Sequence, residues 1–223
     1  MTEPDVMVYL MTGFLDSGKT QFLTFTLKQD YFQIDGKTLL ILCEEGEEEY
    51  DPMEMLKYGV VIEKVEDQED LTAEWLEEMN RKHEPERVVV EYNGMWKVSD
   101  FENMKLPDGW GIEQKITTVD ASTFQMYLTN LKPLFVEMVR GADMVLFNRC
   151  EDIKPLAGYR RSVKVVSPQA EVIFEDEQGE IENIFEDEVP YDLKAPVIEI
   201  AKEDYGIWYV DMMENPDRYK GKV

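Results

Sequence analysis

Residues Gly13–Thr20 read G-F-L-D-S-G-K-T, and this stretch decides the fold. It fits the pattern G-x-x-x-x-G-K-[ST], in which glycines let the backbone wrap around phosphate groups with its N–H groups pointing inward. The apolar stretch Met7–Thr12 precedes it, and a helical pattern follows it in Phe22, Leu23, Phe25 and Leu27. A strand, a glycine-rich loop and a helix in this order predict a phosphate-binding site, because the helix N-terminus adds partial positive charge.

The rest of the chain alternates short apolar runs with helical patterns, which predicts a three-layer α/β fold with a mainly parallel sheet. We expect strands at Val6–Thr12, Thr38–Cys43, Val60–Val65, Arg87–Tyr92, Lys115–Val119, Met144–Phe147 and Glu171–Phe174. Helices are expected at Gly18–Lys28, Leu71–Lys82 and Ala121–Arg140, the last with Asp120 and Ser122 as N-caps. Val98–Trp110 is rich in turn residues and reads as an exposed loop.

Two acidic stretches interrupt this alternation. Glu44–Glu54 is either a solvated loop or a segment with a switch or metal role. Glu171–Asp192 reads as an edge strand followed by an acidic amphipathic segment, because apolar residues punctuate its carboxylates.

The chain divides into a domain at residues 1–190 and a short extension at 191–223, a linker with an incomplete element. In the extension we expect an extended Val197–Ile200, a strand at Asp204–Tyr209 and a short helix at Met212–Tyr219. Residues 220–223 look like the start of another strand. This ending suggests a fragment of a longer protein, or a tail that exchanges into a partner.

Composition limits the classes of function. The 223 residues are 43% hydrophobic, enough for one α/β domain with a well-buried core. A formal net charge of −25 repels nucleic acid and anionic membranes, so neither is an expected partner. With no basic, apolar leader and no apolar run of about 18 residues, we expect a soluble, cytoplasmic protein. Cys43 and Cys150 are too few for a disulfide framework.

The loop itself assigns several roles. Lys19 would neutralise the β- and γ-phosphates of a nucleotide, and Thr20 would bind Mg²⁺. The remaining nucleotide-binding candidates of the loop are Gly13, Asp16, Ser17, Gly18 and Gln21. Asp16 is unexpected, since a carboxylate near phosphates is unfavourable unless it faces away or touches the metal.

The chain resembles the CobW-like GTPases, members of the SIMIBI class of phosphate-loop proteins, through five features in order. The loop is similar to their G-F-L-G-S-G-K-T. The other four are Cys43–Glu47 with Asp51 for N-E-F-G-E…D, Glu91–Gly94 for E-x-x-G, Thr118–Ala121 for V-D-A, and Gly141–Glu151 for A-D-x-x-x-x-N-K-x-D. Together they cover roughly residues 5–175.

The resemblance implies GTP or GDP as the bound nucleotide and Mg²⁺ as the cofactor. Glu91 would hold Mg²⁺ through water or polarise the attacking water, Asp51 joins the metal set, and Gly94 would offer its N–H to the γ-phosphate. Lys19 and Glu91 are thus the catalytic pair.

The same resemblance assigns the base site. Asn148 would hydrogen-bond the purine, and Arg149 would stack on the ring. Glu151 stands where an Asp would bind guanine, with Asp152 as its alternative. Guanine is favoured over adenine.

Plain structural roles stay open for some of these residues. Glu91 and Asp120 could cap strand ends, and Asn148 could be an ordinary turn residue. No arginine finger is identified; Arg160 and Arg161 are candidates by charge only, and a finger from a partner is an equal alternative.

The chain departs from the family in lacking its C-x-C-C motif, since no cysteine lies near Gly59–Ile62. Thiolate-based metal delivery is therefore not supported, and Cys43 and Cys150 are expected to be small buried residues. Gln21 stands where a second Thr is frequent. The carboxylates that could still hold a hard cation weakly are Glu44, Glu45, Glu47, Glu48 and Glu49.

Residues 203–223 resemble the opening of a small β domain that is associated with bacterial proteins paired with membrane permeases. The resulting hypothesis is a slow GTPase, used as a switch or a metallochaperone-like accessory to a permease or a metalloprotein client. Homodimerisation across the nucleotide face is expected by analogy with the class. The alternative is a regulatory module that binds nucleotide or metal without hydrolysis. An ATP-dependent kinase or ligase is less favoured, since no Arg-rich lid is evident.

Overall fold

The computed structural model describes residues 4–151, 153, 156–181, 184 and 189–222. Within these residues eight strands form one sheet in the order β3-β2-β4-β1-β5-β6-β7-β8. The strands are β1 Val6–Thr12, β2 Thr38–Leu42, β3 Val60–Lys64, β4 Arg87–Glu91, β5 Trp110–Asp120, β6 Met144–Asn148, β7 Glu171–Asp176 and β8 Gly179–Glu180. Strands β1 to β7 pair in parallel, and β8 pairs antiparallel with β7. The predicted mainly parallel sheet is confirmed.

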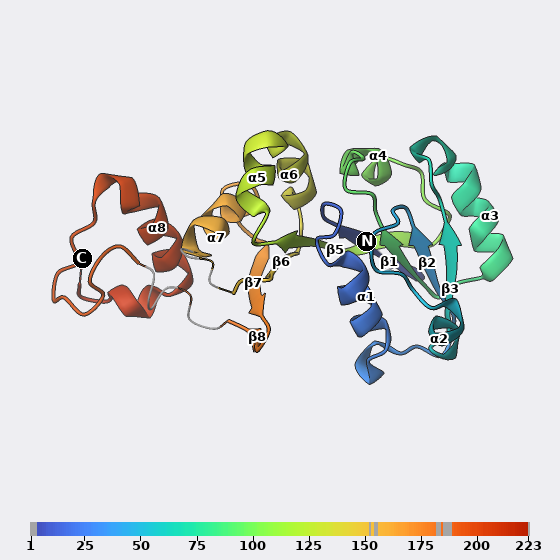
Figure 1. The fold of residues 1–223 in the computed structure, drawn as a ribbon, viewed down its shortest axis with the longest axis horizontal. Helices are drawn as coiled ribbons and strands as arrows, with labels where there is room; N and C mark the ends of the chain where they lie inside the picture. The colour runs from blue at the N-terminus through green and yellow to red at the C-terminus, as the bar shows by residue number, and fades with distance from the viewer. Residues whose placement is uncertain (1–3, 152, 154–155, 182–183, 185–188, 223) are drawn as a thin grey trace.

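Helices cover both faces of this sheet (Figure 1). On one face lie α1 Lys19–Leu27 and α2 Pro52–Lys57; on the other lie α3 Ala73–His83, α4 Val98–Glu102, α5 Phe124–Asn130, α6 Lys132–Val139 and α7 Leu156–Lys164. Because side chains alternate across a strand, Leu39 and Ile41 of β2 pack toward α3 while Leu40 packs toward α1 and α2. The result is the expected three-layer α/β arrangement.

The single helix expected over Ala121–Arg140 is in fact two helices, α5 and α6, separated at Leu131. Pro133 explains the break, because it has no N–H to donate and its ring collides with the carbonyl four residues earlier. Thr123 is the residue that precedes α5, so the assignment of Asp120 or Ser122 as N-cap was wrong.

Two other boundaries differ from the expectation. Residues 98–110 are not simply an exposed loop, because α4 buries Val98 and Phe101 in the core. Strand β7 is not the edge of the sheet, since β8 pairs beyond it. Of the acidic segment that follows, Ile181 and Ile184 pack against the core, and residues 182–183 and 185–188 lie outside the described part.

The C-terminal extension is helical where a strand was expected. In the segment Asp204–Tyr209, Asp204 ends a 3-10 turn and the other residues belong to helix α8, Tyr205–Glu214, so that strand prediction was wrong. Spaced four residues apart, Trp208 and Met212 share one face of α8 and pack with a small cluster centred on Tyr191, Ile198 and Tyr219. Short 3-10 turns complete the described elements at Asp30–Phe32, Gln68–Asp70, Lys202–Asp204 and Pro216–Tyr219.

Helix α8 packs against α7, as Figure 1 shows at the end of the molecule away from β3. None of the helices in the described ranges is both long and apolar enough to cross a bilayer.

Candidate functional site

The predicted site residues come together at the carboxyl edge of the sheet. Glu91, Asp120 and Asn148 are the last residues of β4, β5 and β6, and β1 leads directly into the glycine-rich loop. Strand β1 lies between β4 and β5, the point at which consecutive strands are added on opposite sides. In open α/β sheets this switch point at the carboxyl ends is where ligands bind.

The loop Gly13–Thr20 is closed on itself. The Lys19 side chain curls back so that its Nζ donates to the carbonyl oxygens of Gly13 and Phe14, each at 2.9 Å. The hydroxyl of Ser17 lies 2.9 Å from that of Thr118 on β5, which anchors the loop to the sheet. Both Lys19 and Ser17 are buried. The ammonium group is therefore held at the centre of the loop.

Asp16 adopts a left-handed backbone conformation, with φ of 57°, at the position where the similar loop G-F-L-G-S-G-K-T has glycine. Asp tolerates this conformation better than most residues. Its carboxylate accepts a hydrogen bond from the N–H of Glu47 at 3.3 Å. Asp16 therefore contacts the acidic segment after β2, which accounts for a carboxylate in a phosphate loop.

The predicted magnesium pair is in contact. The Thr20 hydroxyl donates to Oε1 of Glu91 at 2.8 Å, and the Tyr50 hydroxyl donates to the other carboxylate oxygen. Burial raises the pKa of Glu91, more than the hydrogen bonds and the nearby Lys19 lower it. Glu91 is thus a buried carboxylate with one oxygen on the loop residue Thr20 and the other on Tyr50.

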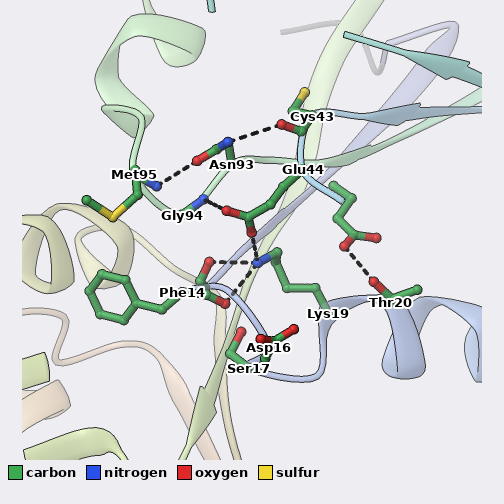
Figure 2. A network of polar contacts seen from close by, with 12 residues as sticks. Phe14, Asp16, Ser17, Lys19, Thr20, Cys43, Glu44, Asn93, Gly94 and Met95 are labelled. Carbon is green, nitrogen blue, oxygen red and sulfur yellow. Dashed lines mark hydrogen bonds and ion pairs between the residues drawn. The ribbon is translucent and has the colours of Figure 1, made fainter. Parts of the chain in front are cut away.

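Glu44 lies on the other side of Lys19. Its Oε2 is 2.6 Å from Nζ of Lys19, and its Oε1 accepts from the backbone N–H of Gly94 at 3.3 Å. Figure 2 shows this carboxylate between the two donors. Gly94 packs so closely that a Cβ there would lie 2.4 Å from the carbonyl oxygen of Gly13. A glycine is therefore required at position 94 by close approach.

The base-site candidates flank the opposite side of the loop. The Asn148 amide donates to the carbonyl oxygen of Ser17 at 2.8 Å, while its Oδ1 is buried without a hydrogen-bond partner in the described part of the chain. Arg149 does not lie free to stack; its guanidinium binds Asp120 at 2.6 Å. Glu151 is exposed, and its alternative Asp152 lies outside the described residues.

Two of the cavities that adjoin the loop also contain other predicted site residues. A small one of about 80 Å³ is lined by Asp16, Lys19, Thr20, Glu47, Glu48, Glu91 and Arg149, together with Leu15, Gly18, Gln21 and Gly46. A larger groove of about 1020 Å³ runs from Gln21, Asn148, Arg149 and Glu151 along α1 and the sheet. The small cavity is below the roughly 300–1,000 Å³ of ordinary ligand pockets. The cavity beside Lys19 and Thr20 is thus small for a nucleotide.

The remaining metal candidate, Asp51, lies outside this constellation. Its carboxylate accepts from the N–H groups of Met53 and Glu54 and caps α2. Its metal role stays a prediction. Arg160 and Arg161 lie on α7 and line neither cavity, so a role as arginine finger gains no geometric support.

The sequence analysis did not identify Tyr50 as a site residue. For Glu44 it left two alternatives open, a place in a solvated loop or a switch or metal role. Nothing about a lone tyrosine after an acidic run indicates a partner 41 positions further on. For Glu44 a signal exists, because it occupies the second position of the segment similar to N-E-F-G-E.

The two cysteines are buried, as predicted. Burial, followed by the charges of Glu91 and Glu44, raises the pKa of Cys43 far above its ordinary value, and burial raises that of Cys150 to about 12. Among the described residues no group of three His, Cys, Asp or Glu side chains is arranged to hold a metal ion.

Comparison with solved structures supports the fold. The protein is similar to the hydrogenase maturation factor HypB from Archaeoglobus fulgidus, with a TM-score of 0.52 and 17% identity over 78% of this chain and 83% of that one. It is also similar to the Zn(II)-bound YjiA GTPase from E. coli, with a TM-score of 0.57 and 22% identity over 82% of this chain and 60% of YjiA. A third similar structure is HypB from Helicobacter pylori in complex with nickel, with a TM-score of 0.51 and 11% identity over 98% of this chain and 90% of that one.

No curated protein sequence matches the chain. The model of the CobW/HypB/UreG nucleotide-binding domain, however, matches residues 7–174, from β1 to the middle of β7. That range holds the loop, the Glu91–Gly94 segment and the Asn148–Arg149 turn. The chain therefore belongs to the CobW/HypB/UreG family and carries its nucleotide-binding domain.

Proposed function

We propose that this protein is a slow, Mg²⁺-dependent GTPase that works as a nucleotide-controlled switch. The observation that carries the proposal is the 2.8 Å contact between the Thr20 hydroxyl and Glu91, directly beside the loop lysine. This pair offers two oxygen ligands, one at the start of α1 and one at the end of β4, beside the loop where phosphate-loop proteins hold magnesium next to the nucleotide phosphates.

The chemistry of the donor set fits Mg²⁺, a hard cation that binds carboxylate and hydroxyl oxygens. When bound, the ion would neutralise charge on the β- and γ-phosphate oxygens. The charges around the small cavity also indicate that a cation is needed there. The small cavity is lined by four carboxylates, those of Asp16, Glu47, Glu48 and Glu91, against the two cations Lys19 and Arg149. A polyphosphate without a cation would be repelled there.

The chain's own groups divide the work. Lys19, freed from the loop carbonyls, would bind the β- and γ-phosphates, and the Gly94 N–H would bind the γ-phosphate. Glu91 would orient the attacking water. Most of the acceleration would then come from positioning and charge stabilisation.

For the base, Asn148 is already oriented by its bond to the Ser17 carbonyl, and its unpaired Oδ1 is available to a ligand donor. Glu151 lines the same groove and would accept from guanine N1 and N2, which adenine cannot match. These two residues support guanine as the preferred base. Arg149 would contribute by bracing the loop and not by stacking.

The decisive experiment is a titration with fluorescent GTP and ATP analogues, with and without Mg²⁺, together with a phosphate-release assay. We expect Mg²⁺-dependent GTP binding that Lys19→Ala abolishes, and turnover that Glu91→Gln abolishes. Lys28→Ala is the matched control, since Lys28 ends the same helix but pairs with Glu54 away from the loop. Binding without any hydrolysis would favour the regulatory module, and no binding at micromolar concentrations would make the loop vestigial.

The partner of the switch stays a prediction. A membrane permease or a metalloprotein client and a homodimer across the nucleotide face remain the candidates. Zinc-bound YjiA and nickel-bound HypB make a metal-handling client the first of these to test. Co-purification in the presence of a non-hydrolysable GTP analogue, compared with GDP, would show which partner depends on the nucleotide state.

A further inference from the structure

The Glu44 carboxylate occupies both donors that the proposed function reserves for the γ-phosphate. Its two oxygens lie 2.6 Å from Nζ of Lys19 and 3.3 Å from the N–H of Gly94. Its side chain is 9% exposed and that of Lys19 3%, so water does little to screen this pair. The contact is a buried, charge-assisted one, made by an anion with two oxygens on the two donors.

These donors cannot serve two anions at once. A γ-phosphate oxygen on Lys19 and Gly94 would need the positions that the Glu44 oxygens hold, and both groups carry negative charge. At such separations in a buried site the repulsion between them is strong. A triphosphate therefore has to displace Glu44, whereas a diphosphate, which has no γ-phosphate, does not compete for the Gly94 N–H.

The neighbours of Glu44 couple its position to a whole segment. In residues 44–50, the N–H of Glu47 donates to Asp16, and the hydroxyl of Tyr50 donates to Glu91. Both ends and the middle of the segment are thus tied to the nucleotide-binding machinery. Glu45 pairs away from the site, with the exposed Lys64.

We infer that Glu44 acts as an internal substitute for the γ-phosphate, setting the preference between GTP and GDP and holding residues 44–50 closed until a triphosphate arrives. The inference rests on the proposed function and adds the residue through which the triphosphate is sensed. Release of Glu44 is the step that converts γ-phosphate binding into movement of an acidic surface segment.

The test is the ratio of GTP to GDP affinity, measured with Mg²⁺ by competition against a fluorescent nucleotide. Glu44→Ala is expected to raise affinity for GTP by about tenfold relative to GDP, within the range usual for coupled sites. The matched control is Glu45→Gln, which removes one negative charge from the same segment without touching the site. It should change both affinities equally and leave the ratio unaltered.

A second readout follows the segment itself. Glu49 is exposed and lines neither cavity, whereas Cys43 and Cys150 are buried, so Glu49→Cys can be labelled selectively with an environment-sensitive dye. A non-hydrolysable GTP analogue, and not GDP, should change the emission. In the Glu44→Ala background the label should report the released state before any nucleotide is added.

The outcomes separate the inference from the proposed function. If wild type binds both nucleotides and Glu44→Ala leaves their ratio and the label unchanged, the inference is overturned and the GTPase proposal stands. If wild type and every variant bind neither nucleotide, both are overturned. Should Glu44→Ala unfold, Glu44→Gln keeps the shape and removes the charge, and must raise the ratio in the same direction.

Discussion

The guanidinium of Arg149 lies 2.6 Å from Oδ2 of Asp120 and 2.8 Å from the carbonyl oxygen of Asp16. One side chain thus ties the ends of β5 and β6 to the phosphate loop. Arg149 and Asp16 both have left-handed backbone conformations, with φ of 53° and 57°. Two strained residues meet at this contact, which indicates that it fixes the shape of the loop.

Removing the Asp120 charge should cost stability at neutral pH. Asp120 is 13% exposed and Arg149 47%, so we expect a loss of about 1 kcal/mol for Asp120→Asn, the upper range for a partly exposed pair. Burial alone would raise the pKa of Asp120, but hydrogen bonds from Ser122 and Arg149 outweigh it and hold the pKa below its ordinary value of 3.8. A lowered pKa stabilises the fold above about pH 3.8, and that contribution is lost as the pH falls further.

This prediction is checked by measuring the free energy of unfolding in urea for wild type and Asp120→Asn between pH 7 and pH ~2.5. The two proteins should differ by a constant amount down to about pH 4 and then converge. Asp30→Asn, an exposed aspartate beyond the end of α1, should follow the wild-type curve throughout. A gap that stays constant to the lowest pH would contradict the assignment to this pair.

Gly94→Ala should destabilise the protein and reshape the loop. A Cβ at this position would lie 2.4 Å from the carbonyl oxygen of Gly13 and 2.8 Å from Cα of Phe14, so two backbone segments must separate. We expect a loss of about 1–3 kcal/mol in the free energy of unfolding. Gly158→Ala is the contrasting control: in the first turn of α7 its Cβ would meet no atom of the described residues within 4 Å, and a gain of up to about 1 kcal/mol is expected. Equal effects of the two changes would refute the close-approach argument.

The fold and much of the site could be predicted from sequence because they follow local rules. Alternating apolar runs gave the strands, and G-x-x-x-x-G-K-T placed the loop between β1 and α1. The parallel topology then brings the carboxyl ends of β1, β4 and β6 together, so Glu91 and Asn148 had to lie near the loop. The break between α5 and α6 was also readable, from Pro133, but the longer periodic pattern outweighed it.

Side-chain pairings between distant segments were not readable. Glu44 and Tyr50 belong to an acidic run whose composition is that of a solvated loop, yet both are drawn inward by partners on the loop and on β4. The aromatic residues of α8 favour a strand by local preference. The segment is nevertheless a helix, in which Trp208 and Met212 pack on one face. In both cases tertiary contacts outweigh local preference.

Tyr50→Phe should lower the stability of the nucleotide-free protein more than that of the protein with bound Mg²⁺ and nucleotide. The change leaves a buried oxygen of Glu91 without its donor, which costs about 1–3 kcal/mol. Bound Mg²⁺ would compensate, so the difference in Tm between Tyr50→Phe and wild type should shrink when Mg²⁺ and a GTP analogue are added. Tyr31→Phe, at a side chain 77% exposed, controls for loss of a hydroxyl and should have no effect. A gap in Tm that is independent of ligand would argue against a shared site on Glu91.

Glu91→Gln should change how stability depends on pH in the absence of nucleotide. Burial, with the nearby charge of Glu44, raises the pKa of Glu91 above its ordinary value of 4.5 despite hydrogen bonds from Tyr50 and Thr20. The folded state then holds this proton more tightly than the unfolded chain, so the contribution to stability is full below 4.5 and is lost as the pH rises through the folded-state pKa. Each tenfold difference in proton affinity corresponds to about 1.4 kcal/mol.

Glutamine mimics the protonated acid at every pH, so Glu91→Gln should not lose stability as the pH rises through the folded-state pKa of Glu91. Urea unfolding from pH ~4 to pH ~8 should therefore show wild type losing stability relative to Glu91→Gln as the pH rises. Glu54→Gln, a partly exposed glutamate paired with Lys28, removes the same charge away from the site and should leave the pH dependence of wild type intact. Parallel curves for wild type and Glu91→Gln would mean that the buried carboxylate ionises at its ordinary pKa, and the charge balance argued for the magnesium site would then have to be redrawn around the other carboxylates of the cavity.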